Sequence, residues 1–185
     1  MARRMSTVWY FAYGSNMSSA TLRGRREVSC VRALPARVPG WRLVLDKPPL
    51  IPLNRAFANI VADPATEVLG VIYEVSLDDL DHIELTEGVR IGNYDRVEVT
   101  AWPLSRADAA PLAAFSLTSA KRDASLRPSR SYMDLLIAGA IEHGLPDPYI
   151  EHLRSVPADP DDEEAVRWRP IMDAGMRKRN GHGTG

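Results

Sequence analysis

The order of hydrophobic and polar positions predicts a series of strands followed by two late helices. VWYFAY at 8–13 is an apolar run bounded by a turn, which predicts a central strand. EVLGVIYEV at 67–75 is apolar on both faces and predicts a second central strand. GWRLVLD at 40–46 and DRVEVTAW at 95–102 alternate polar and apolar positions and predict strands, and LAAFSL at 112–117 is a further candidate.

Helical spacing is found in RSYMDLLIAGAIEHGLP at 130–146, which ends in a glycine and proline stop signal. DPYIEHLRSV at 147–156 predicts a second helix, and SSATLRGRR at 18–26 predicts a helical turn begun by a serine cap. DKPPLIPLNRAF at 46–57 carries three prolines and predicts an irregular loop rather than a central strand.

Strands first and helices late, interrupted by one short helix, predict an α+β domain built on an antiparallel or mixed sheet or barrel. The 185 residues fit one domain, and 45% hydrophobic with 25% charged residues is ordinary globular composition. The tail, DPDDEE followed by RKRNGHGTG, is polar, and we expect its last residues to be disordered.

Charge and cysteine content narrow the choice of partners. The formal net charge of −1 offers no broad field for nucleic acid or an anionic membrane, so a small molecule is favoured. The single cysteine excludes an internal disulfide and a cysteine-based zinc site. No apolar run reaches the roughly 20 residues of a membrane span, and the N-terminus does not fit a secretory signal, so we expect a cytoplasmic protein.

One short helix directs a carboxylate toward the core. SLDDLDHIELTEGV has a serine cap and a glycine stop, which predict a helix over 77–87. Leu77, Leu80 and Ile83 share one face of it, and Glu87 falls in the middle of that face. Burial and the negative end of the helix dipole both disfavour the charged form of Glu87, which makes it a candidate general acid and base.

Other interpretations of this helix stay open. Glu84 lies at the edge of the same face and is the competing catalytic candidate. Glu87 could instead pair with an arginine such as Arg90. The neighbouring acidic residues and His82 spread around the helix, which indicates a solvated face rather than a metal site.

The first strand stops abruptly at Gly14, Ser15 and Asn16, which are common turn residues. Backbone N–H groups freed at such a break would also form a small anion-binding pocket. Ser15 does not lie in a nucleophile elbow, and the stretch lacks the lysine and the glycine spacing of a phosphate loop. Neither a serine hydrolase nor a phosphate loop is therefore predicted.

Four segments in order, YFAYGSNM, GVIYEV, TEGVRIGNY and PSRSYMDLLIAGAIEHGLP, resemble the gamma-glutamylcyclotransferases, and the likeness extends from Tyr10 to about Pro157. The resemblance implies a small β-barrel flanked by helices over a domain 1–157, followed by a polar and partly disordered extension, 158–185. It also implies an enzyme that converts a gamma-glutamyl amine or amino acid into 5-oxoproline and the free amine without metal or cofactor. Self-association into a homodimer is left open.

The resemblance also implies a set of site residues. The catalytic glutamate falls on Glu87, and the substrate-binding residues are Tyr13, Gly14, Ser15, Asn16, Tyr94 and Tyr132. The proline-rich segment differs from the family and should border the pocket, so the leaving amine is not assigned.

Two other functions remain as alternatives to a general cyclotransferase. One is an enzyme that removes a gamma-glutamyl protecting group from a biosynthetic intermediate. The other is a non-catalytic binding module for a small metabolite. A buried, unpaired carboxylate at Glu87 favours an enzyme over the module, because such a group is costly unless it serves a function.

Overall fold

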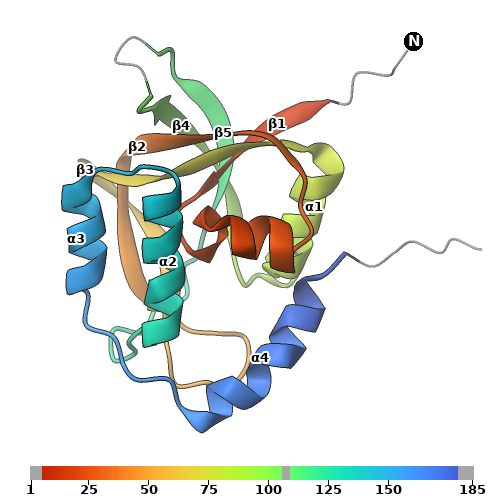
Figure 1. Cartoon of the computed structure of the whole chain (residues 1–185), viewed down its shortest axis with the longest axis vertical. Coiled ribbons are helices and arrows are strands. Elements are labelled where there is room, and N and C mark those ends of the chain that lie inside the picture. The colour runs from red at the N-terminus through yellow and green to blue at the C-terminus, as the bar shows by residue number, and fades with distance from the viewer. Residues whose placement is uncertain (1–5, 106–108, 179–185) are drawn as a thin grey trace, which may run out of the picture.

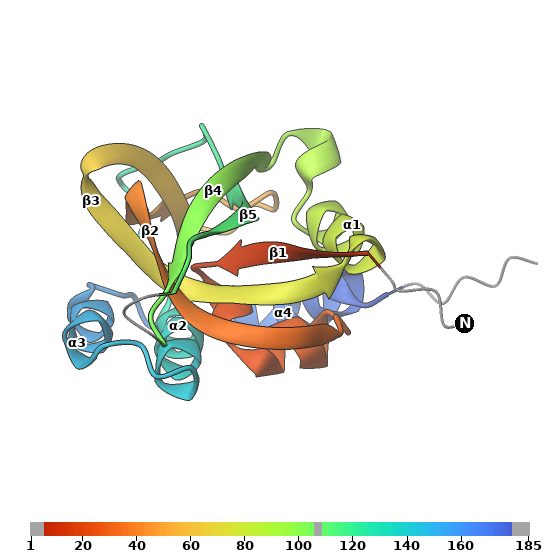
Figure 2. The same ribbon diagram turned by 90° about the horizontal axis from the view of Figure 1, so that it is seen from above.

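Five strands close into a barrel in the computed structural model, which describes residues 6–105 and 109–178. Their order around the barrel is β1-β3-β2-β4-β5 (Figure 1, Figure 2). All neighbouring strands are antiparallel except β1 and β5, which pair in parallel at Tyr10 and Phe115. The mixed barrel confirms the expected α+β class. The strands are β1 (Thr7–Ala12), β2 (Cys30–Lys47), β3 (Phe57–Ser76), β4 (Asp95–Pro103) and β5 (Leu112–Thr118).

β2 and β3 form one long hairpin, and both are much longer than the sequence predicted, with 18 and 20 residues. The first half of β2 was not predicted, because Pro35 and Pro39 disfavour a strand there. The ladder shifts its register between Pro39 and Trp41, where Gly40 adopts a φ of +82°. A bulge of this kind tolerates proline inside a strand. The hairpin connection, residues 48–56, contains no strand, as expected of the proline-rich segment.

Helices cover the barrel on several sides. α2 and α3 pack side by side, and α1 lies apart from them, beside the start of β1 (Figure 2). Among residues 6–105 and 109–178, no helix is long and apolar enough to cross a membrane. The helices are α1 (Leu77–Thr86), α2 (Arg130–Glu142), α3 (Asp147–Ser155) and α4 (Glu163–Met176), with short helices η1 (Ser15–Met17), η2 (Ala20–Arg25) and η3 (Val89–Ile91).

α1 confirms the helix predicted from its capping signals. It begins after the N-cap Ser76, whose side chain accepts a backbone N–H, and Glu87 is its C-terminal cap residue. Leu80 and Ile83 are buried as expected. Leu77 is 48% exposed, so its predicted place on the buried face is wrong. At 3.6 residues per turn it lies about 120° from Ile83, outside the buried stripe.

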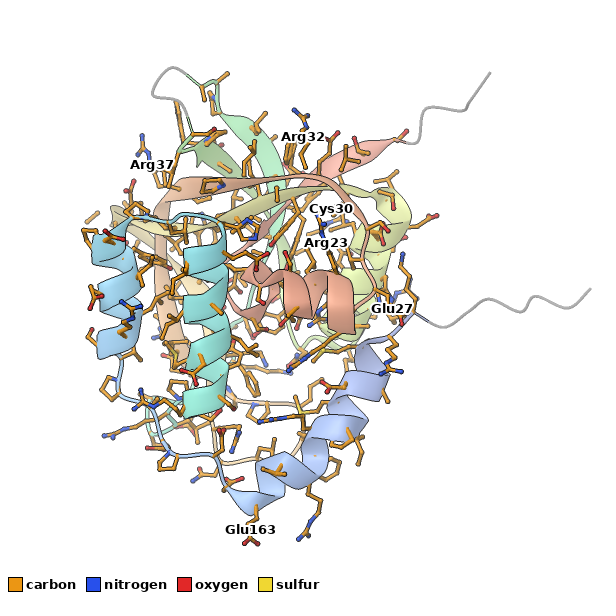
Figure 3. The ribbon with its side chains drawn as sticks, in the orientation of Figure 1. Arg23, Glu27, Cys30, Arg32, Arg37 and Glu163 are labelled. Atoms are coloured by element: carbon orange, nitrogen blue, oxygen red, sulfur yellow. The ribbon has the colours of Figure 1, made fainter. Side chains whose placement is uncertain are left out.

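The helical turn predicted at 18–26 is present as η2, but the predicted serine cap is wrong. The Ser19 side chain makes no capping hydrogen bond, and its backbone N–H donates to Glu142 Oε2 of α2 at 3.0 Å. Arg23 Nη2 donates to Cys30 Sγ at 2.7 Å, which ties η2 to the start of β2 (Figure 3). The segment is therefore positioned by tertiary contacts rather than by its own cap.

α4 was not predicted, because only a polar extension was expected after residue 157. Val166 and Ile171 of α4 are 57% and 60% exposed, so no clear apolar stripe marks the helix. Its end reaches α1, where His82 Nε2 lies 2.9 Å from the Met176 carbonyl oxygen. The domain boundary at 157 stays a prediction, and the final residues expected to be disordered, 179–185, lie outside the described residues.

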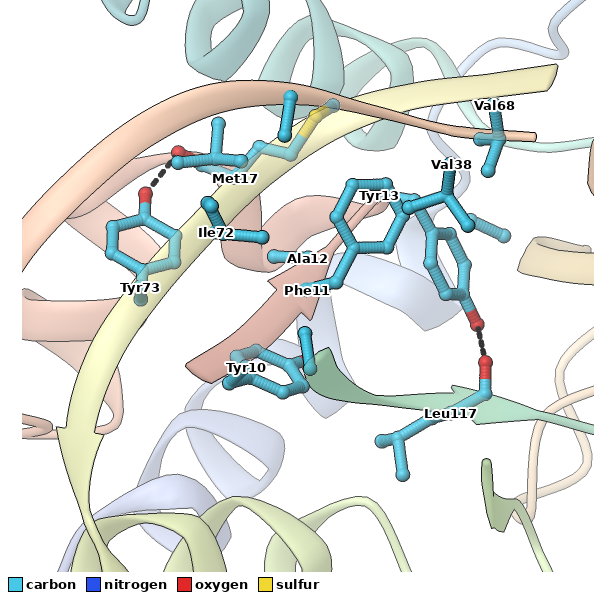
Figure 4. Close-up of a cluster of buried hydrophobic side chains, with 14 of the residues drawn as sticks. Tyr10, Phe11, Ala12, Tyr13, Met17, Val38, Val68, Ile72, Tyr73 and Leu117 are labelled. Carbon is cyan, nitrogen blue, oxygen red and sulfur yellow. Dashed lines mark hydrogen bonds between the residues drawn. The ribbon is translucent and has the colours of Figure 1, made fainter. Parts of the chain in front are cut away.

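The barrel core holds the turn that follows β1 (Figure 4). Phe11, near the end of β1, is completely buried. Tyr73 Oη donates to the Met17 carbonyl oxygen at 2.7 Å, and Tyr13 Oη donates to the Leu117 carbonyl oxygen at 2.6 Å. Hydrogen bonds from core tyrosines therefore fix the turn at both ends.

α2 approaches the same turn at Gly139. A Cβ on Gly139 would lie 2.7 Å from the Met17 carbonyl carbon and 2.7 Å from the Ser18 nitrogen. Such distances are far below normal contact, so only glycine permits this packing.

Gly139→Ala should destabilise the protein by roughly 1–3 kcal/mol, because the added methyl group must push the turn away from α2. The matched control is Gly175→Ala in α4, where a Cβ meets no atom within 4 Å. Alanine favours helix over glycine by about 1 kcal/mol, so the control should keep or raise its melting temperature. Equal melting temperatures for the two variants would contradict the packing role of Gly139.

Candidate active site

A cavity of about 340 Å³ lies at the end of β1, bordered by the barrel, α1 and α4. Its lining includes each site residue named from the sequence: Tyr13, Gly14, Ser15, Asn16, Glu87, Tyr94 and Tyr132. The structure therefore brings these residues together, and their individual roles stay predictions. Other lining residues were not expected from the sequence: Arg26, Lys47 and Asn93.

One oxygen of the Glu87 carboxylate is held by the protein. Glu87 Oε1 accepts from Asn16 Nδ2 at 3.0 Å and forms an ion pair with Arg26. Arg26 is 2% exposed and also donates to Asn16 Oδ1 at 2.7 Å and to Thr86 Oγ1. Within the part of the chain that the structure describes, no hydrogen bond reaches Glu87 Oε2. The side chain keeps 20% exposure, so this second oxygen is available to a ligand.

The contacts distinguish between the interpretations of Glu87 and Glu84. Glu87 does pair with an arginine, but the partner is Arg26 rather than Arg90, and the expectation of an unpaired carboxylate is wrong. Arg26 reaches Glu87 across 61 positions of sequence, a contact that helical spacing does not reveal. Glu84 does not line the cavity and instead meets Arg96 of β4 at 3.0 Å.

Ala58, near the start of β3, fixes two tyrosines of the cavity. Its backbone N–H donates to Tyr132 Oη at 3.0 Å, and its carbonyl oxygen accepts from Tyr94 Oη at 2.8 Å. A Cβ on Gly14 would lie 3.2 Å from Tyr132 Oη and 3.2 Å from the Ala58 Cβ. The tyrosines and the turn therefore converge on one small region of the cavity.

The tyrosines of the cavity keep their protons at neutral pH. Burial, followed by the charge of Glu87, holds the pKa of Tyr10 above its ordinary value. Burial also raises the pKa of Tyr132, although donors from Ala58 and Ser15 act on its oxygen in the opposite direction. Because the Tyr132 oxygen already accepts hydrogen bonds, its own O–H can be donated to a ligand.

Lys47, the last residue of β2, is a buried cation that the sequence analysis missed. It is 1% exposed, and its ammonium donates to Asn93 Oδ1 at 2.5 Å and to the Pro48 carbonyl oxygen at 2.7 Å. The ammonium lies 4.6 Å from the centre of the Tyr94 ring. Burial lowers the pKa of Lys47 from 10.5 to about 8, while the charge of Glu87 opposes this shift. A lysine beside prolines gave no sign of burial in the sequence.

Two segments outside the barrel strands also contribute side chains to the lining of the cavity. Pro49, Leu50 and Ile51 come from the proline-rich loop, which confirms that this segment borders the pocket. Met172 and Met176 come from α4. These five side chains are apolar, in contrast to Arg26, Lys47 and Glu87, which line the same cavity.

The acidic residues of α1 do not form a metal site. Within the described ranges, no group of three or more His, Cys, Asp or Glu side chains is placed to hold a metal ion. Asp79 departs from the expected solvated face, because it is 4% exposed and contacts Ser76 and Lys178. Its carboxylate holds the hydroxyl group of the N-cap Ser76 and pairs with Lys178, which follows α4.

A cavity beside a closed barrel that contains a carboxylate, buried cations and protonated tyrosines is typical of an enzyme that acts on a small polar molecule. Comparison with known proteins supports this class. Residues 67–153 match the AIG2-like family. Bovine gamma-glutamylcyclotransferase is 30% identical over 167 residues, which cover 89% of this chain and 85% of that protein.

Two further comparisons agree. Gamma-glutamyl cyclotransferase aclK of Aspergillus oryzae is 33% identical over 165 residues, or 80% of this chain, although this chain covers only 60% of that protein. A solved structure of a gamma-glutamyl cyclotransferase has the same fold, with a TM-score of 0.73 at 24% identity over 91% of this chain and 99% of that chain. The chain belongs to the gamma-glutamylcyclotransferase family. This confirms the family and the enzyme class predicted from the sequence.

Gly14→Val should lower turnover of a gamma-glutamyl donor by roughly 10²-fold, because its branches would displace Tyr132 and Ala58 from the cavity. The melting temperature, measured in parallel, should fall much less than turnover does, because Gly14 is only partly buried and lines the cavity. Gly24→Val in η2 is the control, since a Cβ there meets no atom within 4 Å. Unchanged catalytic efficiency in Gly14→Val would exclude this turn from the site.

Proposed function

We propose that the protein converts a gamma-glutamyl amine or amino acid into 5-oxoproline and the free amine, with Glu87 as general acid and base. The observation that carries the proposal is the asymmetric environment of the Glu87 carboxylate. Oε1 is fixed by Asn16 and the buried Arg26, and Oε2 is available to a ligand in the cavity. A carboxylate held in this way can exchange a proton without changing its position.

The proton moves from the substrate to Glu87 and back. Glu87 takes a proton from the α-ammonium of the substrate, and the neutral amine then attacks the γ-carbonyl carbon. A carbon–nitrogen bond forms to close the five-membered ring. The leaving nitrogen receives this proton from Glu87, and its bond to the γ-carbon breaks. The ring nitrogen still carries one proton more than the lactam needs, and this second proton passes through Glu87 to the free amine, which departs as its ammonium form. Atoms and charge balance, and water is neither consumed nor released.

The γ-carbonyl oxygen gains negative charge during ring closure, and donors near Gly14 would stabilise it. Tyr132 can supply one of them, because its oxygen accepts from Ala58 and its O–H proton is not needed there. The Tyr94 hydroxyl donates to the Ala58 carbonyl oxygen, so this residue shapes the cavity without offering its proton.

The alternatives differ in their products. Removal of a protecting group from a biosynthetic intermediate uses the same chemistry and differs only in the leaving amine. A binding module would hold a ligand and release no product. Incubation with a panel of gamma-glutamyl amino acids and amines, followed by measurement of 5-oxoproline, separates these functions. Ligand binding without product from any donor would favour the module.

Glu87→Gln should lower the rate of the chemical step by roughly 10²–10⁴-fold, because the amide cannot take up a proton. The substitution also leaves Arg26 buried without a counter-charge, which should reduce stability by roughly 1–3 kcal/mol. Turnover under conditions where the variant remains folded, together with its melting temperature, separates the two effects.

Glu84→Gln is the matched control for Glu87→Gln. Glu84 pairs with Arg96, whose side chain is 46% exposed, so the loss of this pair should cost less than about 1 kcal/mol. The control should keep its activity. Loss of activity in Glu84→Gln with full activity in Glu87→Gln would refute the assignment of the acid and base.

Tyr132→Phe should lower kcat by roughly 10²-fold with little change in KM, because the hydroxyl acts on charge that develops only in the transition state. Tyr149→Phe is the control, since its hydroxyl donates to the Leu69 carbonyl oxygen away from the cavity. Both variants lose a tyrosine hydroxyl bonded to the backbone, so their stabilities should fall by similar amounts. A similar kcat in the two variants would argue against Tyr132 as a donor.

A further inference from the structure

The cavity contains a cation without an acidic partner. Arg26 and Glu87 neutralise each other as an ion pair, and Arg25 lies 3.7 Å from Asp173. Lys47 also lines the cavity, and no acidic side chain in residues 6–105 or 109–178 forms an ion pair with it. A buried ammonium is costly unless a partner supplies negative charge. An anionic ligand would supply it.

The ammonium of Lys47 has a donor to spare. It has three N–H groups, of which one goes to Asn93 Oδ1 and one to the Pro48 carbonyl oxygen. The centre of the Tyr94 ring lies 4.6 Å from the Lys47 ammonium and stabilises its charge by a cation–π interaction, but the ring supplies no negative charge. The third N–H is therefore left for a ligand in the cavity.

Asn93 fixes Lys47 relative to Glu87. Its Nδ2 donates to the backbone carbonyl oxygen of Glu87 at 2.8 Å, while its Oδ1 accepts from the Lys47 ammonium. The negative charge of Glu87 favours the charged form of Lys47, but the two side chains are farther apart than the 4.0 Å limit of an ion pair. The cavity therefore presents a carboxylate and an ammonium that are close to each other but separate.

We propose that Lys47 binds the α-carboxylate of the gamma-glutamyl group and so determines specificity for that group. This inference rests on the proposed function. The α-ammonium and the α-carboxylate of the substrate are attached to the same carbon atom, so a site that takes the ammonium proton at Glu87 needs a cation close by. The turn at Gly14 and Tyr132 are then left for the developing oxyanion.

The test uses 5-oxoproline and its neutral amide, 5-oxoprolinamide, as ligands in calorimetry. 5-Oxoproline keeps the α-carboxylate and lacks the leaving amine, so it reports on one end of the site alone. Lys47→Met should bind 5-oxoproline roughly 10- to 100-fold more weakly than the wild type, the value of a buried charged hydrogen bond. The affinity of Lys47→Met for the amide should stay within about 3-fold of the wild-type affinity.

Lys121→Met is the matched control, because Lys121 is exposed, lies outside the cavity lining and loses the same charge. It should change neither affinity by more than about 3-fold. If Lys47→Met lost affinity for the acid and the amide equally, or lost no affinity for the acid, the assignment would be overturned. A Lys47→Met defect confined to donors with a carboxylate on the leaving amine would overturn it as well.

The wild type alone tests the same assignment if Lys47→Met does not fold. It should prefer the acid over the amide by roughly 10-fold or more at pH 7. The preference should decline above pH 8, since burial lowers the pKa of Lys47 to about 8 and the ammonium loses its charge there. Burial raises the pKa of Tyr94, so this residue stays neutral over the range, and the nearby charges of Glu87 and Lys121 act on the pKa of Lys47 in opposite directions. Equal affinities at pH 7 would refute the assignment.

The outcomes also separate this inference from the proposed function. Preferential binding of the acid without 5-oxoproline from any donor would refute the activity and leave the Lys47 site standing. Product formation by an enzyme that does not distinguish acid from amide would refute the role of Lys47 and leave the activity standing.

Discussion

The buried guanidinium of Arg26 is the constraint on which the candidate site depends. It contacts Asn16 in the turn after β1 and both Thr86 and Glu87 at the end of α1. Removing a guanidinium from water is costly unless its donors find acceptors, so these segments are stable together only in one arrangement. Glu87 caps a short helix, and helix ends fray. The contacts of Arg26 therefore fix the carboxylate that follows α1.

The site lies where regular structure ends, and side chains satisfy the backbone groups that the strands leave unpaired. Tyr73 donates to the Met17 carbonyl oxygen, and Asn93 donates to the Glu87 carbonyl oxygen. Ala58 pairs both of its backbone groups with tyrosine hydroxyls. Core residues thus also position the site, and burial is what keeps their hydroxyl groups protonated and able to donate.

Local patterns predicted the elements whose signals lie within a few residues. The capping signals located α1, and helical spacing placed Glu87 toward the core. Arg26 and Lys47 could not be predicted in this way, because charged residues are normally solvated and their partners lie 61 and 46 positions away. The family resemblance named the carboxylate and the tyrosines of the cavity but not the cations that accompany them. α4 was missed because its apolar residues do not form a buried stripe.

The cavity brings a charged set of side chains and an apolar set together within one small fold. The charged set includes Lys47 at the end of β2 and Glu87 at the end of α1, and under the proposed reaction it receives the gamma-glutamyl end of the substrate. The apolar set comes from the loop after β2 and from α4, with Leu50 and Met176 among its members. Neither side chain belongs to the strand ladder, and Leu50 is 54% exposed. Under the proposed reaction, the choice of leaving amine would depend on these two segments, and ring closure would depend on the fixed carboxylate of Glu87 and the tyrosine held by Ala58.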